Sequence, residues 1–184
     1  MSTRRTARGS VTAPRIRRGP PEYARSLTRE GDHPRRVLEA LSEGVVFTSL
    51  EHSAAADALA VLRPRLPPAE RPAALVRAFG YAGRPYDYDF DFRTDAALVC
   101  TELVYKAYEA AGLRFPVVEI LGRPVLPANE LARRFDADFG AAAQQFDLIL
   151  FVDGHERSGV AVEASVEKFR QSWRRPKWRV RAMD

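Results

Sequence analysis

The sequence contains a single cysteine, Cys100, which is the side chain best suited to covalent chemistry. Apolar residues in the stretch CTELVYKAYEAAG recur at helical spacing, and this predicts a helix from about Cys100 to Ala111 that ends at Gly112. A cysteine in the first turn of a helix faces free N–H groups and the positive end of the helix dipole, both of which stabilise a thiolate. Cys100 is therefore either a nucleophile or a small apolar residue that fills a core.

The distribution of charge separates the two ends of the chain from its body. Six arginines and no acids lie in residues 1–20, which leaves 23 basic groups against 24 acidic ones in the rest of the sequence. We expect residues 1–21 to form a disordered basic tail and residues 22–184 to form one domain, because 184 residues suit a single core. Such basic tails predict weak, salt-sensitive binding to polyanions.

No apolar run approaches the roughly 18 to 20 residues that a membrane-spanning helix needs, and the N-terminus lacks the apolar stretch of a secretory signal. We therefore expect a cytoplasmic protein. One cysteine cannot form an internal disulfide, and one cysteine with three histidines does not supply a usual zinc site. No metal and no cofactor are predicted.

Short predicted strands and helices must position Cys100, and together they predict an α+β fold. Three short runs separated by polar turns predict an antiparallel meander. We assign strands to residues 22–28, 35–41, 45–52 and 147–154, and we expect the last of these to be buried. Helices are assigned to residues 53–64, 67–83, 100–111 and 126–135. The segment 53–64 turns extended before Pro64, and residues 165–173 are helical or irregular.

The stretches VLEALSEGVV, GRPYDYDFDF and CTELVYKAYEAAG occur in this order, and together they resemble the YiiX/YaeF-like group of permuted papain-like cysteine hydrolases in the NlpC/P60 superfamily. The match covers about residues 22–115. The resemblance implies a small antiparallel sheet packed against helices, incomplete at the N-terminus relative to that group. It also implies hydrolysis or acyl transfer at the amide or ester of a small peptide, amino-acid or acyl-containing substrate, without a cofactor.

Carried over residue by residue, the resemblance makes Cys100 the nucleophile and Glu39, in the second strand, the residue that orients the base across from the cysteine helix. The stretch with Tyr86 and Asp87 is expected near the substrate cleft. Tyr23 stands where the group has its histidine. A phenol with an ordinary pKa of about 10 accepts a proton poorly at neutral pH, so the alternative is a catalytically silent member that binds a peptide, amino acid or acyl ligand in the old cleft.

Several of these residues also have ordinary structural interpretations. Glu39 is equally compatible with a solvent-facing strand position. The run YDYDFDF, residues 86–92, alternates with period two and predicts an extended segment with its aromatic side chains on one face. Its acids lack the glycine and distal glutamate of a calcium loop. Residues 169–180 mix basic and aromatic side chains, which favours packing of Trp173 and Trp178 onto the body over nucleic-acid binding.

Overall fold

The structure is a computed structural model that describes residues 28–155 and 160–175. The predicted basic tail and Tyr23 lie outside these ranges, as does Trp178. Within them, no helix combines the length and the apolar character needed to cross a lipid bilayer.

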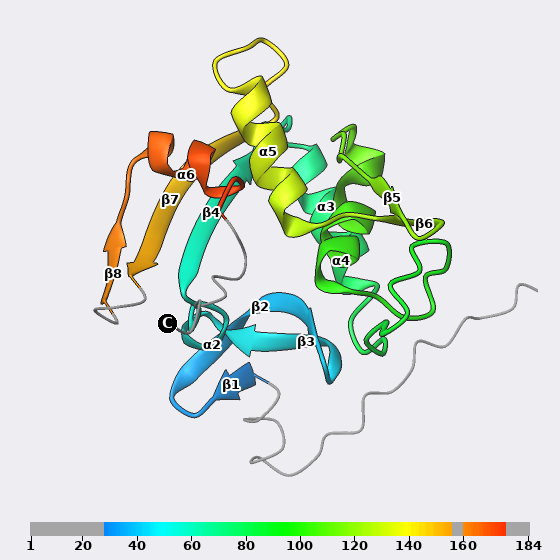
Figure 1. The fold of residues 1–184 in the computed structure, drawn as a ribbon. Coiled ribbons are helices and arrows are strands. Elements are labelled where there is room, and N and C mark those ends of the chain that lie inside the picture. The colour runs from blue at the N-terminus through cyan, green and yellow to red at the C-terminus, as the bar shows by residue number, and fades with distance from the viewer. Residues whose placement is uncertain (1–27, 156–159, 176–184) are drawn as a thin grey trace, which may run out of the picture.

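Small antiparallel sheets and helices make up the described chain, as the α+β prediction requires (Figure 1). The first sheet is the expected meander, although only its second and third predicted strands fall within the described residues. The strands are β1 (Arg29–Glu30), β2 (His33–Leu41) and β3 (Gly44–Ser49) in the first sheet; β4 (Ala58–Pro64), β7 (Phe146–His155) and β8 (Val160–Glu163) in the second; and β5 (Val118–Ile120) with β6 (Arg123–Val125) as a hairpin.

The helices lie on two sides of the molecule (Figure 1). Two of them, α5 and α6, cover the β4–β7–β8 sheet, while α3 and α4 pack together beside the β5–β6 hairpin. The helices are α2 (Leu50–Ser53), α3 (Glu70–Phe79), α4 (Cys100–Tyr108) continued by a 3₁₀ turn (Glu109–Ala111), α5 (Ala128–Asp138) and α6 (Val166–Ser172).

Several predicted elements differ from the structure. The predicted strand 45–52 ends at Ser49, and the residues that follow form α2. The Ala-rich stretch 53–64 is mostly the strand β4, because pairing with β7 along its whole length overrides a modest helix propensity. The predicted buried strand exists as β7, but Phe151 is its one buried residue among those described, and Ile149 is 47% exposed. Antiparallel sheets commonly have one solvated face, and β7 follows this rule.

The cysteine helix is placed by a small core that joins it to the meander. Leu103 of α4 forms one buried cluster with Ala40 of β2, Val45 of β3 and Leu98, which precedes the helix. Gly112 closes the helical segment with a φ of 83°, as the sequence predicts. The predicted helix over 100–111 is thus confirmed, with its last turn in 3₁₀ form.

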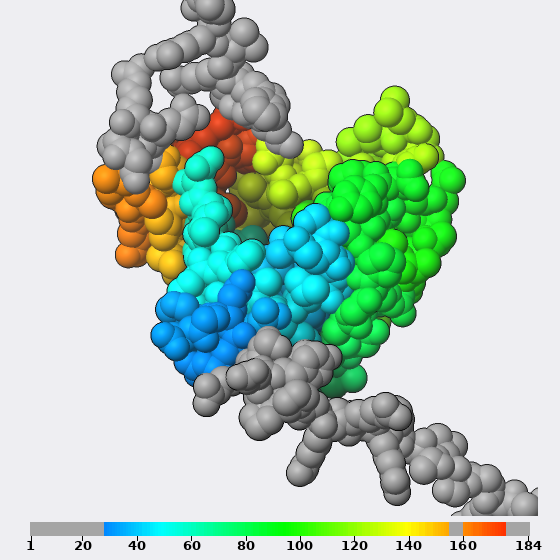
Figure 2. All heavy atoms as spheres, turned by 90° about the horizontal axis from the view of Figure 1, so that it is seen from below, coloured from blue at the N-terminus to red at the C-terminus, as the bar shows by residue number. Residues whose placement is uncertain are grey.

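Seen from below, the surface is hollowed between the meander and β4 on one side and α5 and α6 on the other (Figure 2). Three buried clusters of the described residues underlie these elements. One lies between α4 and the meander, and a second is formed by Phe135, Phe151 and Phe169 of α5, β7 and α6. The third contains Val99, which caps α4, and packs against Leu131 of α5, so the start of α4 contacts both sides of the molecule.

Candidate functional site

Cys100 is the first residue of α4, and its side chain is exposed. The two residues before it, Leu98 and Val99, are buried, and Val99 caps the helix with extended backbone angles. The chain thus leaves the core at Cys100 and starts the helix at the surface. This exposure excludes the interpretation of Cys100 as a core-filling residue and leaves its thiol free to react.

The loop before the helix holds Tyr86 next to this helix start. Residues 86 and 98 form a parallel bridge, in which the Asp87 N–H donates to the Leu98 carbonyl over 3.3 Å. The Tyr86 side chain packs against two buried clusters, one that contains Leu98 and one that contains Val99. Burial, and then the electrostatic effect of the neighbouring Cys100, raise the pKa of Tyr86. Its hydroxyl therefore stays protonated at neutral pH and is a hydrogen-bond donor.

The aromatic and acidic stretch 86–92 forms turns, which corrects the prediction of an extended segment. Asp87 is buried, and its carboxylate accepts from the N–H groups of Asp89 over 2.9 Å and Asp91 over 2.6 Å. These local bonds to the backbone compete with extended structure. They also occupy both oxygens of Asp87. Among the described residues, no group of three or more His, Cys, Asp or Glu side chains is arranged to hold a metal ion.

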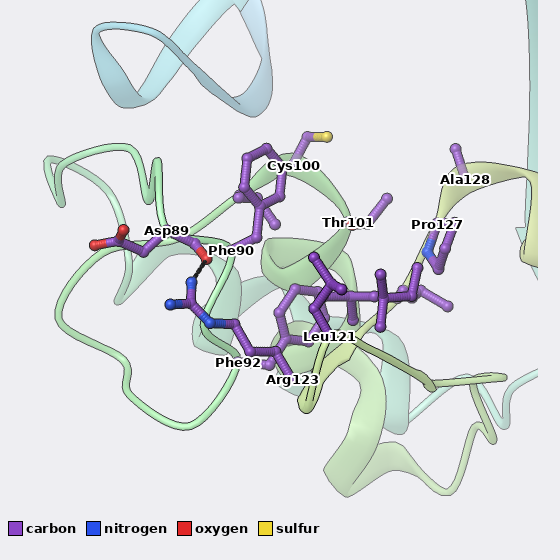
Figure 3. A pocket seen from close by; sticks show the side chains of 13 residues that line it. Asp89, Phe90, Phe92, Cys100, Thr101, Leu121, Arg123, Pro127 and Ala128 are labelled. Carbon is purple, nitrogen blue, oxygen red and sulfur yellow. Dashed lines mark hydrogen bonds between the residues drawn. The ribbon is translucent and has the colours of Figure 1, made fainter.

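A pocket of about 700 Å³ opens beside Cys100 (Figure 3). Its walls come from the loop before α4, the first turn of α4, the β5–β6 hairpin and the start of α5. Figure 3 shows the ring of Phe90 beside Cys100. The lining residues are Asp89, Phe90, Phe92, Val99, Cys100, Thr101, Ile120, Leu121, Arg123, Val125, Leu126, Pro127 and Ala128.

Of the two predicted cleft residues, neither lines this pocket directly. Tyr86 stands behind Phe90, with their ring centroids 6.4 Å apart and their planes perpendicular. Asp87 lies inside the loop and supports its turns. Both residues shape the wall of the pocket from behind.

Two arginines join the walls of the pocket to each other. Arg93, in the loop before α4, donates to the carbonyl oxygen of Gly122 in the β5–β6 turn over 2.7 Å. Arg123, at the start of β6, donates in the opposite direction to the carbonyl oxygen of Asp89. These reciprocal bonds hold the hairpin against the loop and fix the width of the pocket.

Glu102 lies beneath the helix start and is fully buried. One of its oxygens, Oε2, accepts from the backbone N–H of Val99, and the other, Oε1, has no hydrogen-bond partner. Burial raises the pKa of Glu102 to about 7, although the bond from Val99 and the charge of Lys106 act in the opposite direction. The sequence does not mark Glu102 as a site residue, because sequence spacing does not reveal that this position is sealed from solvent.

Glu39 lies on the far face of the meander from α4. Its neighbour Ala40 packs in the cluster with Leu103, and successive strand residues point to opposite faces. The Glu39 carboxylate instead accepts from the hydroxyl groups of Thr48 and Ser53, the latter over 2.7 Å. The structure thus does not place Glu39 toward the cysteine helix, and a role in orienting a base stays a prediction.

The described histidine side chains do not line the pocket. His33 pairs with Glu51 over 3.0 Å and His52 pairs with Glu30 over 2.9 Å, near the junction of the meander and α2. His33 begins β2, although the predicted strands 22–28 and 35–41 leave it in the turn between them. The side chain of His155 lies outside the described residues, as does Tyr23.

A family model of known proteins matches most of this chain. No curated protein sequence matches the chain. Among solved structures, the crystal structure of a protein described as the metalloprotein yiiX of Escherichia coli O157:H7 is similar, with 21% identity over 76% of this chain and 78% of that chain and a TM-score of 0.43. The family model of the permuted papain-like amidase enzymes, YaeF/YiiX, matches residues 18–165. The chain therefore belongs to the C92 family of permuted papain-like amidases.

Proposed function

We propose that the protein is a cysteine hydrolase that cleaves an amide through Cys100. The observation that carries this proposal is the position of an exposed thiol at the first residue of α4, at the edge of a pocket of about 700 Å³. Free N–H groups and the positive end of the helix dipole meet at that point and favour a thiolate. Membership of an amidase family supports the same chemistry.

In the first half of the reaction, the sulfur of Cys100 attacks the amide carbonyl carbon and a C–S bond forms. The carbonyl oxygen becomes an oxyanion, which the backbone N–H of Cys100 is placed to stabilise. The C–N bond then breaks, and the amine leaves with the proton that the thiol has given up. In the second half, water attacks the thioester, which releases the carboxylic acid and restores the thiol.

Tyr86 is proposed as a second donor to the oxyanion or the thiolate. Its ring packs behind Phe90 and against the residues that precede Cys100, and the raised pKa of its phenol keeps the proton on the hydroxyl. Two side chains outside the described ranges are the proposed acceptors of the thiol proton: His155, and Tyr23, which stands at the position of the family histidine and accepts a proton less readily.

A second candidate function is binding without turnover. It is favoured by the pairing of His33 and His52 with glutamates away from the pocket, so that neither imidazole acts on Cys100. In this case the protein holds a peptide, amino acid or acyl ligand in the pocket beside an intact thiol.

The test is acylation of the full chain by p-nitrophenyl acetate, followed by intact-mass analysis. We expect an acetyl adduct on the wild-type protein that decays with release of acetate, no adduct on Cys100→Ala, and hydrolysis of acetyl p-nitroanilide that also depends on Cys100. A stable adduct that never turns over would support the binding protein. Equal hydrolysis by wild type and Cys100→Ala would overturn the proposed function.

A further inference from the structure

Two residues of the pocket have an unusual backbone conformation. Phe90 has a φ of 54° and Leu121 a φ of 53°, and no other non-glycine residue in the described ranges has a positive φ. Bulky residues are rarely found in this region of backbone space, and such strain concentrates at sites of function. Both residues line the same pocket, one from each of its facing walls.

Leu121 is also the most exposed large apolar residue among those described, at 97%. It forms the two-residue turn between β5 and β6 together with Gly122, which also has a positive φ of 75°. Turns of this kind favour Asn, Asp or Gly at the first position. Neither burial nor turn geometry therefore explains leucine here, and an exposed apolar side chain at a pocket rim indicates contact with an apolar ligand.

The two charged residues that line the pocket, Asp89 and Arg123, direct their charged groups elsewhere. The guanidinium group of Arg123 donates to the Asp89 carbonyl oxygen, and the carboxylate of Asp89 points away from the pocket (Figure 3). Most of the remaining lining is aliphatic or aromatic. A polar peptide placed here would exchange its hydrogen bonds to water for few new ones, whereas a hydrocarbon chain has no such bonds to lose.

We propose that the pocket binds the aliphatic acyl chain of the substrate, so that the scissile bond is a fatty-acyl amide placed at Cys100. This inference rests on the proposed function for the chemical step, in which the acyl carbon passes from the amide nitrogen to the sulfur and then to water. The chain lies between Phe90 and Leu121, and its carbonyl end lies at the thiol.

Binding is tested with the full-length Cys100→Ala protein, which cannot consume the ligand. The probes are N-acylglycines with acetyl, butanoyl, hexanoyl, octanoyl and dodecanoyl chains, and the dissociation constant is measured by calorimetry below their micelle concentrations. We expect affinity to rise about threefold to fourfold for each methylene that enters the pocket. Affinity that is independent of chain length would overturn the inference.

A variant of the turn removes the apolar contact without harming the fold. Leu121→Asn, in the Cys100→Ala background, places a favoured turn residue at this position, so the hairpin is expected to form at least as well. We expect the octanoyl-to-acetyl affinity ratio to fall at least fivefold. The matched control is Leu75→Asn, at a leucine on α3 that is 51% exposed and outside the pocket, which should leave the ratio unchanged. Equal ratios in both variants would contradict the role of Leu121.

Turnover separates this inference from the proposed function. Hydrolysis of acyl p-nitroanilides by the wild-type chain should favour octanoyl over acetyl in kcat/KM. Chain-length-dependent binding without any Cys100-dependent hydrolysis would overturn the proposed function and support the acyl pocket. Cys100-dependent hydrolysis that is indifferent to chain length would overturn the acyl pocket and support the proposed function.

Discussion

The carboxylate of Glu102 accepts a hydrogen bond from the backbone N–H of Val99, with 3.4 Å between Val99 N and Glu102 Oε2. The bond ties the third residue of α4 back to the residue that caps it. Cys100 lies between these two residues in the chain. A fully buried side chain therefore fixes the backbone from which the thiol projects.

We predict that Glu102 makes stability fall as pH rises toward neutrality. Burial raises the folded-state pKa from 4.5 to about 7, so between these values the folded protein holds a proton that the unfolded chain has lost. The contribution of protonated Glu102 to the free energy of unfolding is therefore greatest below pH 4.5. It is lost as the pH rises to about 7, and the free energy of unfolding does not change further with this group above that pH. Glu102→Gln is neutral at every pH and should gain about 1–3 kcal/mol relative to wild type between pH 5 and pH 8.

Urea unfolding of both proteins at several pH values measures this difference. The pKa of Glu102 is also affected by Asp87, Asp95 and Lys106. These residues are present in both proteins, so their own titration largely cancels in the difference between the two free energies of unfolding. Parallel stability curves for wild type and Glu102→Gln across this range would show that Glu102 does not titrate there.

How far the sequence predicts the structure is clear at α4 and at the loop before it. The helix over 100–111 follows from local spacing, and its core contacts agree with that spacing. Aromatic and acidic residues alternate over 86–92 as in a strand. The Asp87 carboxylate, however, accepts hydrogen bonds from two backbone N–H groups, and the segment forms turns instead. Such side-chain competition leaves no periodic signal. The Leu121–Gly122 turn carried a signal that sequence reasoning missed, since a glycine follows an apolar residue between two short strands.

The position of Cys100 at a helix start was predictable from the sequence, and the surroundings of the candidate site were not. Cys100 is identified by its type and by its place at a helix start. The direction of Glu39 depends on strand parity, and a shift of one residue moves a side chain to the other face. The burial of Glu102 depends on tertiary packing around the start of α4, which no local pattern encodes.

Removal of the Tyr86 hydroxyl should weaken catalysis and leave the fold intact. Tyr86→Phe keeps the ring that packs against both buried clusters, and loses a donor beside the thiol. Loss of one donor to an oxyanion commonly costs 10²-fold or more, so we expect kcat to fall about 10- to 100-fold. Tyr108→Phe, at the far end of α4, is the matched control. Equal kcat values in the two variants would exclude Tyr86 from the reaction.

Glu39 should matter for stability more than for chemistry. Glu39→Ala removes the acceptor for the hydroxyl groups of Thr48 and Ser53 and should cost about 1–3 kcal/mol. Glu43→Ala, in the exposed β2–β3 turn, should cost little by comparison. The rate of Cys100 alkylation by iodoacetamide should be the same in both variants. A large fall in that rate in Glu39→Ala alone would instead support Glu39 as an orienting residue of the site.

The contact between β3 and the loop before α4 should tolerate no side chain at Gly44. Gly44 has a φ of 109°, and a Cβ there would overlap the carbonyl oxygen of Arg84, which accepts from the Val45 N–H over 2.8 Å. Gly44→Ala should lower the free energy of unfolding in urea by about 2–4 kcal/mol and should alter the alkylation rate of Cys100, because this loop leads to the helix start.

Gly31→Ala is the control. Gly31 has a φ of 57°, and a Cβ there meets nothing within 4 Å, so this variant adds backbone strain without a steric overlap. Equal losses in the two variants would show that close packing against Arg84 does not position the loop.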